Sequence, residues 1–130
     1  MSEPIWLDEV DLFAIHEEQL RAHGGDAGLL NRDRVGSAAA RPRNMYAYYP
    51  DTPTEELAAA LAVGLAKGHG FVDGNKRTAC VAALTFLKLN GIEIIAADPE
   101  LADVFIAVAD GTLSQAELTE WLLENSMRLD

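Results

Sequence analysis

The 130-residue sequence contains only one cysteine, no excess of basic side chains, and no apolar stretch near the roughly 18 residues that would span a bilayer. The single Cys80 excludes an internal disulfide, and its helical neighbours predict a small buried thiol. Ten basic residues against 21 acidic ones give a net charge of −11. This charge argues against a general nucleic-acid or acidic-membrane surface.

The first ten residues also lack the features of a secretion signal. They contain no basic region and no long apolar run, so no signal peptide is expected and a cytoplasmic location is the default expectation. Hydrophobic residues make up 49% of the chain and charged residues 24%, which is typical of folded rather than disordered proteins. At this length we expect one domain over residues 1–130 with a core of its own.

Capping signals and apolar spacing predict an all-α bundle of about six helices, without repeats. Only Ile92-Glu93-Ile94-Ile95 looks extended, and it is too short to found a sheet on its own. The fold prediction is therefore all-α with at most a minor extended segment near 92–95. The expected helices span about 8–23, 32–41, 52–68, 75–89, 98–110 and 114–123.

Several helix boundaries depend on single residues. Asp8 and Ser114 are expected to cap their helices, and Gly24 and Gly111 to end them. Pro42 is expected to end the second helix. The third is expected to start with a capping box in Thr52-Pro53-Thr54-Glu55.

Apolar positions predict which faces are buried. In the first helix the expected apolar stripe consists of Val10, Phe13, Ala14 and Leu20. The third helix is so rich in alanine and leucine that burial on several faces is expected. His16 and His23 are expected to have surface or core roles, because no third metal ligand accompanies them. The connector 45–50 contains three tyrosines that either pack beneath it or line a pocket, packing being favoured: Tyr46, Tyr48 and Tyr49.

The reactive side chains concentrate in His69-Gly70-Phe71-Val72-Asp73-Gly74-Asn75-Lys76-Arg77, between two predicted helices. A helix N-terminus carries unpaired N–H groups and a partial positive charge, so it is a natural anion site. An imidazole can exchange a proton near neutral pH, and a carboxylate can hold a divalent cation. A base, a metal carboxylate and an anion cradle are the components of a phosphoryl- or nucleotidyl-transfer site.

The stretch resembles the Fic/Doc family motif H-x-F-x-[D/E]-x-N-[G/K]-R, and it is closest to the Doc branch because Lys76 stands where Fic adenylyltransferases usually have glycine. Gly70 departs from the proline usual in Fic motifs. The resemblance implies a mainly helical fold and the use of ATP with Mg²⁺. It also implies transfer of a phosphoryl group to a protein hydroxyl.

The resemblance assigns roles to individual residues. His69 is expected to be the general base and Asp73 the Mg²⁺ ligand, although Asp73 could also cap the next helix. Phe71 is expected to be a hydrophobic anchor rather than a catalytic residue. Arg41 is interpreted as a plain helix-end charge, or alternatively as a cation that either supports the site residues from behind or clamps the substrate. The residues expected to bind nucleotide or phosphate are Gly74, Asn75, Lys76 and Arg77.

The resemblance also implies partners. A Phd-type antitoxin is expected, since the chain lacks the inhibitory [S/T]-x-x-x-E-[G/N] sequence found in many Fic proteins. Elongation factor Tu is the expected protein substrate, and its modification would arrest translation. Two alternatives stay open: transfer of AMP instead of phosphate, and a catalytically weak binding module that acts by association.

Overall fold

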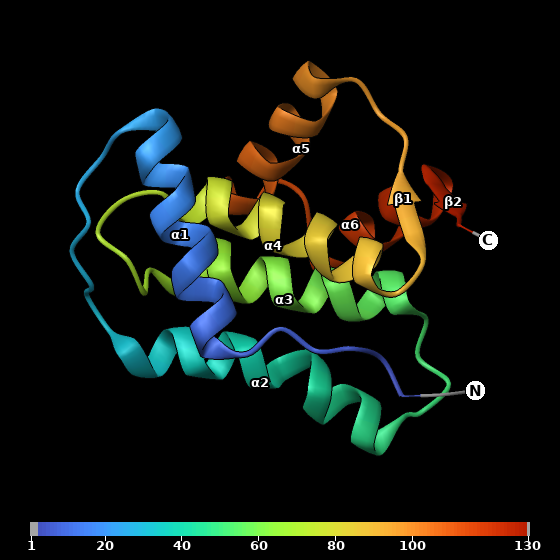
Figure 1. Cartoon of the computed structure of the whole chain (residues 1–130). Helices are drawn as coiled ribbons and strands as arrows, with labels where there is room; N and C mark the ends of the chain where they lie inside the picture. The colour runs from blue at the N-terminus through green and yellow to red at the C-terminus, as the bar shows by residue number, and fades with distance from the viewer. Residues whose placement is uncertain (1–2, 130) are drawn as a thin grey trace.

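A computed structural model describes residues 3–129, so the domain expected over 1–130 includes three residues outside the described part. The described chain forms six α-helices and two short strands (Figure 1). This confirms the predicted all-α fold. The elements are α1 (Glu9–His23), α2 (Arg32–Tyr48), α3 (Thr54–Gly68), α4 (Asn75–Leu89), β1 (Ile92–Ile94), α5 (Asp98–Asp110), α6 (Gln115–Glu124) and β2 (Ser126–Arg128).

Helix α3 runs through the middle of the molecule and packs against α2, α4, α5 and α6 (Figure 1). Its side chains from Leu57 to Ala62 are all at most 1% exposed, so the expected burial on several faces is confirmed. Small residues let the neighbouring helices approach closely. At Gly64 an added Cβ would lie 3.1 Å from the Cβ of Ala38 on α2.

Helix α4 packs along α3 with its own small and apolar face, which includes Ala79, Ala82 and Phe86. Helix α1 also contacts α4, close to the loop that joins α3 and α4. Trp6, before α1, stacks on Phe86 with ring centroids 5.8 Å apart. The core therefore fixes the position of both helices that flank the motif.

No helix in the described chain is long and apolar enough to cross a membrane.

The two strands form one antiparallel pair in which Ile92 lies opposite Arg128 and Ile94 opposite Ser126. The predicted extended segment is thus confirmed over residues 92–94. Its partner strand was not predicted, because residues 126–128 show neither alternation nor a turn signal linking them to β1.

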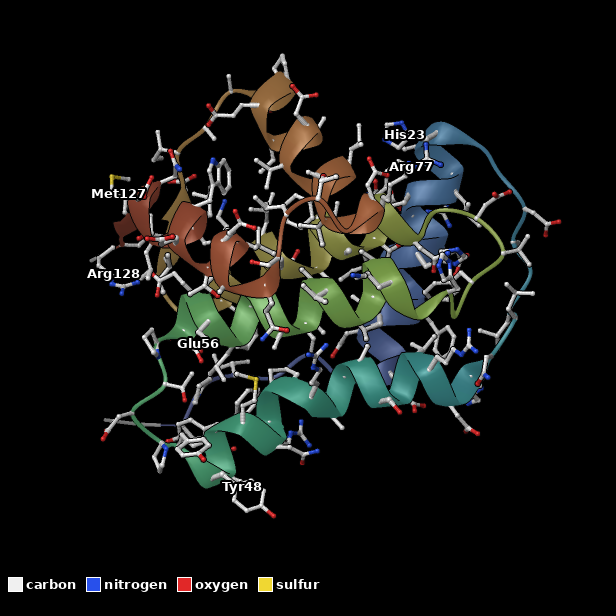
Figure 2. All side chains as sticks on the ribbon, turned by 180° about the vertical axis from the view of Figure 1, so that it is seen from behind. His23, Tyr48, Glu56, Arg77, Met127 and Arg128 are labelled. Atoms are coloured by element: carbon white, nitrogen blue, oxygen red, sulfur yellow. The ribbon has the colours of Figure 1, made fainter. Side chains whose placement is uncertain are left out.

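The predicted end of the second helix is wrong, because α2 continues to Tyr48 with Pro42 inside it. An interior proline costs roughly 3 kcal/mol in an isolated helix. Here Pro42 is buried, and the extra turns bring Tyr46 against Trp6 with centroids 5.7 Å apart. Packing thus offsets the local cost. The favoured packing of two of the tyrosines is also wrong. Tyr48 is 81% exposed (Figure 2), and Tyr49 is 72% exposed.

The predicted capping box of the third helix is wrong as well. Pro53 occupies the N-cap position, and the hydroxyl of Thr52 donates to the carbonyl of Tyr49 instead, at 2.7 Å. Glu55 is fully buried and pairs with Arg128 rather than with the helix start. The distant arginine is a stronger partner for a buried carboxylate than a local N–H group.

In α1 the predicted apolar stripe is wrong in part. Val10 is 76% exposed and Ala14 is exposed, whereas the buried side chains are Leu12 and His16. Other boundary predictions are confirmed. Asp8 caps α1 and Ser114 caps α6, both in capping boxes, and glycines with positive φ follow α1 and α5.

Candidate functional site

The motif loop connects the end of α3 to the start of α4 through two left-handed residues. His69 follows α3 with φ +50°, and Gly74 precedes α4 with φ +83°. A positive φ is costly for a residue with a Cβ, which explains the glycine at position 74. The segment 28–31 pins the loop, because the carbonyl of Gly70 accepts from the N–H groups of Leu30 and Asn31.

Phe71 anchors the loop in the core, where it is 2% exposed. Its ring lies parallel to that of His16, with centroids 3.6 Å apart, and edge-on to Phe13 at 5.8 Å. Asn75 braces the same residue from the helix side. Its Oδ1 accepts from the Phe71 N–H at 3.2 Å, and its Nδ2 donates to the Phe71 carbonyl at 2.9 Å.

The motif predicts phosphate binding for Asn75, and in the structure the Oδ1 and Nδ2 atoms of its amide both hold the loop. One hydrogen of Nδ2 remains for a ligand, because an amide nitrogen carries two. Asn75 therefore determines the loop conformation whether or not it also contacts a phosphate.

The loop opens into a cavity of about 830 Å³. Ligand cavities in proteins are commonly about 300–1,000 Å³. One side is polar and contains six of the predicted site residues: His69, Asp73, Gly74, Asn75, Lys76 and Arg77. The other side is mainly apolar and comes largely from α4 and α5: Cys80, Val81, Leu101, Ala102, Phe105, Ile106 and Ala109.

The polar side of the cavity contains the N-terminal end of α4 and two cationic side chains. Among the six described helices, α4 alone has no acidic residue in its first turn, where Lys76 and Arg77 add to the positive end of the helix dipole. Lys76 is exposed at the rim, and Arg77 donates from Nη2 to the carbonyl of Gly24 at 3.3 Å. Arg77 thereby lies beside the end of α1 (Figure 2).

Asp73 is exposed on the loop and does not cap α4, since Gly74 holds the N-cap position. Its Oδ2 accepts from the N–H of Asp26 at 2.8 Å, which steadies the carboxylate. Its Oδ1 makes no hydrogen bond within residues 3–129. The described residues contain no group of three metal-ligating side chains. A lone carboxylate nevertheless fits Mg²⁺, which commonly uses one or two carboxylates together with substrate phosphates.

The structure does not bring Arg41 to the cavity. Its Nη2 donates to Oε1 of Gln115, on α6, at 2.8 Å. The described residues that line the cavity include neither Arg41 nor any of the three tyrosines.

Several residues at or near the cavity had no predicted role in the site, and three of them carry titratable side chains. Asp98, at the start of α5, lines the cavity, as does Cys80, which is half-buried rather than buried. Burial raises the pKa of the Cys80 thiol to about 11. His16 lies behind the loop, with Nε2 2.8 Å from the carbonyl oxygen of Asp73. No local pattern links His16 or Asp98 to the motif, because α1 and α5 meet it only in the folded chain.

Comparison with known proteins identifies the family. The Fic/DOC family model matches residues 6–87, a range that includes the whole loop, and the chain belongs to this family. Protein kinase doc of Escherichia phage P1 is 35% identical over 112 residues, covering 86% of this chain and 88% of that protein. Toxin Doc of Mycolicibacterium smegmatis is 41% identical over 76 residues, covering 58% of each. The predicted resemblance to the Doc branch is thus confirmed.

Proposed function

We propose that this protein is a Doc-type toxin that transfers the γ-phosphoryl group of ATP to a hydroxyl of a protein substrate. The observation that carries the proposal is the convergence of His69, Asp73 and the cationic start of α4 on one cavity. The similarity to a protein kinase supports this reaction, and the similarity to a toxin supports the toxin role.

The polar side of the cavity binds the triphosphate. The N–H groups at the start of α4 point along the helix axis toward the ligand, and Lys76 and Arg77 add two positive charges. Asp73 would hold the Mg²⁺, which would supply positive charge to neutralise the phosphates. The apolar side formed by α5 receives the nucleoside.

His69 acts as the general base. It is exposed at the cavity rim, where a protein substrate can reach it. Its imidazole takes the proton of the substrate hydroxyl while that oxygen forms a bond to the γ-phosphorus. The bond from the γ-phosphorus to the bridging oxygen breaks, and ADP leaves with that electron pair.

The protein substrate is elongation factor Tu, and a Phd-type antitoxin restrains the enzyme in the cytoplasm. Both partners come from the family resemblance, and the name of the mycobacterial relative supports the toxin role. The geometry is compatible with restraint by another chain. His69 and Lys76 are exposed, so no part of the described chain covers the reactive side of the cavity.

Labelled ATP tests the proposal. Purified protein, elongation factor Tu and Mg²⁺ are incubated with ATP labelled in either the γ- or the α-phosphate. We expect label on the factor from γ-labelled ATP only, and its loss in His69→Ala. Lys88→Ala, an exposed position at the far end of α4, is the matched control and should label normally. Label from α-labelled ATP would establish AMP transfer, and ATP binding without any label would indicate a binding module.

A further inference from the structure

His16 is a buried polar residue that lies outside the motif, on α1, and is 5% exposed. Its ring makes two different contacts with the loop. It stacks on Phe71 at an interplanar angle of 8°, and its Nε2 lies 2.8 Å from the carbonyl oxygen of Asp73. His16 does not line the cavity. Any effect on a ligand must therefore pass through the loop.

The hydrogen bond has a defined direction. A carbonyl oxygen can only accept, so Nε2 of His16 carries the proton and donates it. The peptide between Asp73 and Gly74 is trans, as are all peptides in the described chain. In a trans peptide the C=O and N–H groups point in opposite directions. Holding the Asp73 carbonyl toward α1 therefore turns the Gly74 N–H away from the His16 ring.

Gly74 lines the cavity, and its N–H has no acceptor among the described residues. The imidazole ring also lies against Gly74. A Cβ added to Gly74 would lie 3.5 Å from Cδ2 of His16 and 3.6 Å from its Nε2. One imidazole thus fixes the anchor residue of the loop and the orientation of the peptide at the start of α4.

We propose that His16 is a positioning residue for phosphate binding. Its Nε2–H···O bond to Asp73 directs the Gly74 N–H at a phosphate oxygen of the ligand. This inference rests on the proposed function, because it takes the ligand of the cavity to be a phosphate compound. His16 itself touches neither substrate nor ATP.

Two substitutions distinguish the effect of the hydrogen bond to Asp73 from the effect of the ring stack on Phe71. His16→Phe keeps an aromatic ring against Phe71 but removes the donor, whereas His16→Gln loses the ring but offers an amide N–H at a similar reach. His23→Phe is the matched control, since it changes the same side chain on the same helix at an exposed position. The readouts are the Kd of Mg-ATP without any protein substrate, KM against kcat, and the melting temperature.

We expect His16→Phe to weaken ATP binding about 10- to 100-fold, in keeping with the cost of small displacements of positioned groups. The loss should appear mainly in KM, and His16→Gln should restore most of the affinity even if its melting temperature is lower. His23→Phe should match the wild type. The reverse order, in which His16→Phe binds ATP normally and His16→Gln binds it weakly, would mean that His16 acts only through packing. Affinities equal to the wild type in both variants would also overturn the proposal.

A measurement on the unaltered protein covers the case in which both variants fail to fold. The Gly74 amide signal in a ¹⁵N NMR spectrum should shift when Mg-pyrophosphate is added, and an unchanged signal would contradict the proposal. Failure of the proposed function gives a different pattern. Wild-type protein would then bind ATP but label no protein, while the order of the two His16 variants in ATP binding would still decide the role of His16.

Discussion

Arg128 in β2 donates from both of its terminal nitrogens to the carboxylate of Glu55, at 2.9 and 3.4 Å. The Glu55 side chain is fully buried in the first turn of α3, whereas Arg128 is 62% exposed. The pair thereby fastens the last strand to the central helix, although 73 residues separate the two positions. Figure 2 shows Arg128 at the edge of the molecule, at the opposite end from Arg77.

Removal of this arginine should destabilise the fold without affecting ATP binding. Arg128→Ala leaves the buried carboxylate of Glu55 without its partner, so we expect a loss of about 1–3 kcal/mol in the free energy of unfolding. Urea denaturation measures it. Arg21→Ala is the control, since Arg21 pairs with Glu17 and Glu18 only at exposed positions and should cost less than about 1 kcal/mol. Equal losses in the two variants would contradict the structural role of the buried pair.

Gly64 should resist substitution because α2 and α3 meet there. A Cβ at this position would lie 3.1 and 3.2 Å from the Cβ and Cα of Ala38, both closer than ordinary contact. We expect Gly64→Ala to lose about 1–3 kcal/mol by overpacking, despite the roughly 1 kcal/mol that alanine gains in helix propensity. In Gly68→Ala the nearest atom is 4.0 Å away, so thermal unfolding should be near the wild-type temperature. A Gly64→Ala protein as stable as Gly68→Ala would refute the close contact.

Asn75→Ala should loosen the loop as well as lower activity. The variant loses both hydrogen bonds to Phe71, so we expect the Phe71 amide to exchange about 3- to 10-fold faster, as the loss of one net hydrogen bond implies. Lys76→Ala should weaken ATP binding and leave that exchange rate unchanged. If both variants leave the Phe71 amide equally protected, Asn75 does not brace the loop.

Cys80 reports on the cavity through its pKa, which burial raises from 9.0 to about 11. Alkylation by iodoacetamide requires the thiolate, so at pH 7.5 it should be on the order of 100-fold slower than in the urea-unfolded chain. The alkylation rate should keep rising between pH 9 and pH 11, and saturating Mg-ATP should slow the reaction further.

The raised pKa of Cys80 also affects the stability of the fold. The unfolded thiol ionises first, so the contribution of Cys80 is complete below pH 9 and is lost as the pH rises to 11. Labelling at pH 7.5 as fast as in the unfolded chain would contradict the raised pKa of this half-buried thiol.

Much of the helical framework could be predicted because its signals are local. The capping boxes at Asp8 and Ser114 and the stops at Gly24 and Gly111 each depend on a few adjacent residues. The errors arose where distant contacts decided the outcome. Pro42 stays inside α2 because the following turn packs on Trp6, and Glu55 leaves its expected capping box because Arg128 reaches it.

The residues of the candidate site likewise fall into those that the sequence could predict and those that it could not. The motif residues that line the cavity, His69 and residues 72–77, are close together in the sequence, so their common cavity could be anticipated. The supporting residues could not. His16 belongs to α1 and Asp98 to α5, and only the packing of these helices around α4 brings them near the loop. Arg41 lies far from the motif in the sequence, and the structure pairs it with Gln115 of α6 instead of placing it on the cavity lining.

Mass spectrometry of elongation factor Tu after incubation with the protein and Mg-ATP tests the central claim most directly. The account predicts one added phosphoryl group on a hydroxyl side chain, together with release of ADP and loss of the product in His69→Ala. An added adenylyl group with release of pyrophosphate, or a phosphoryl group that still appears in His69→Ala, would contradict it.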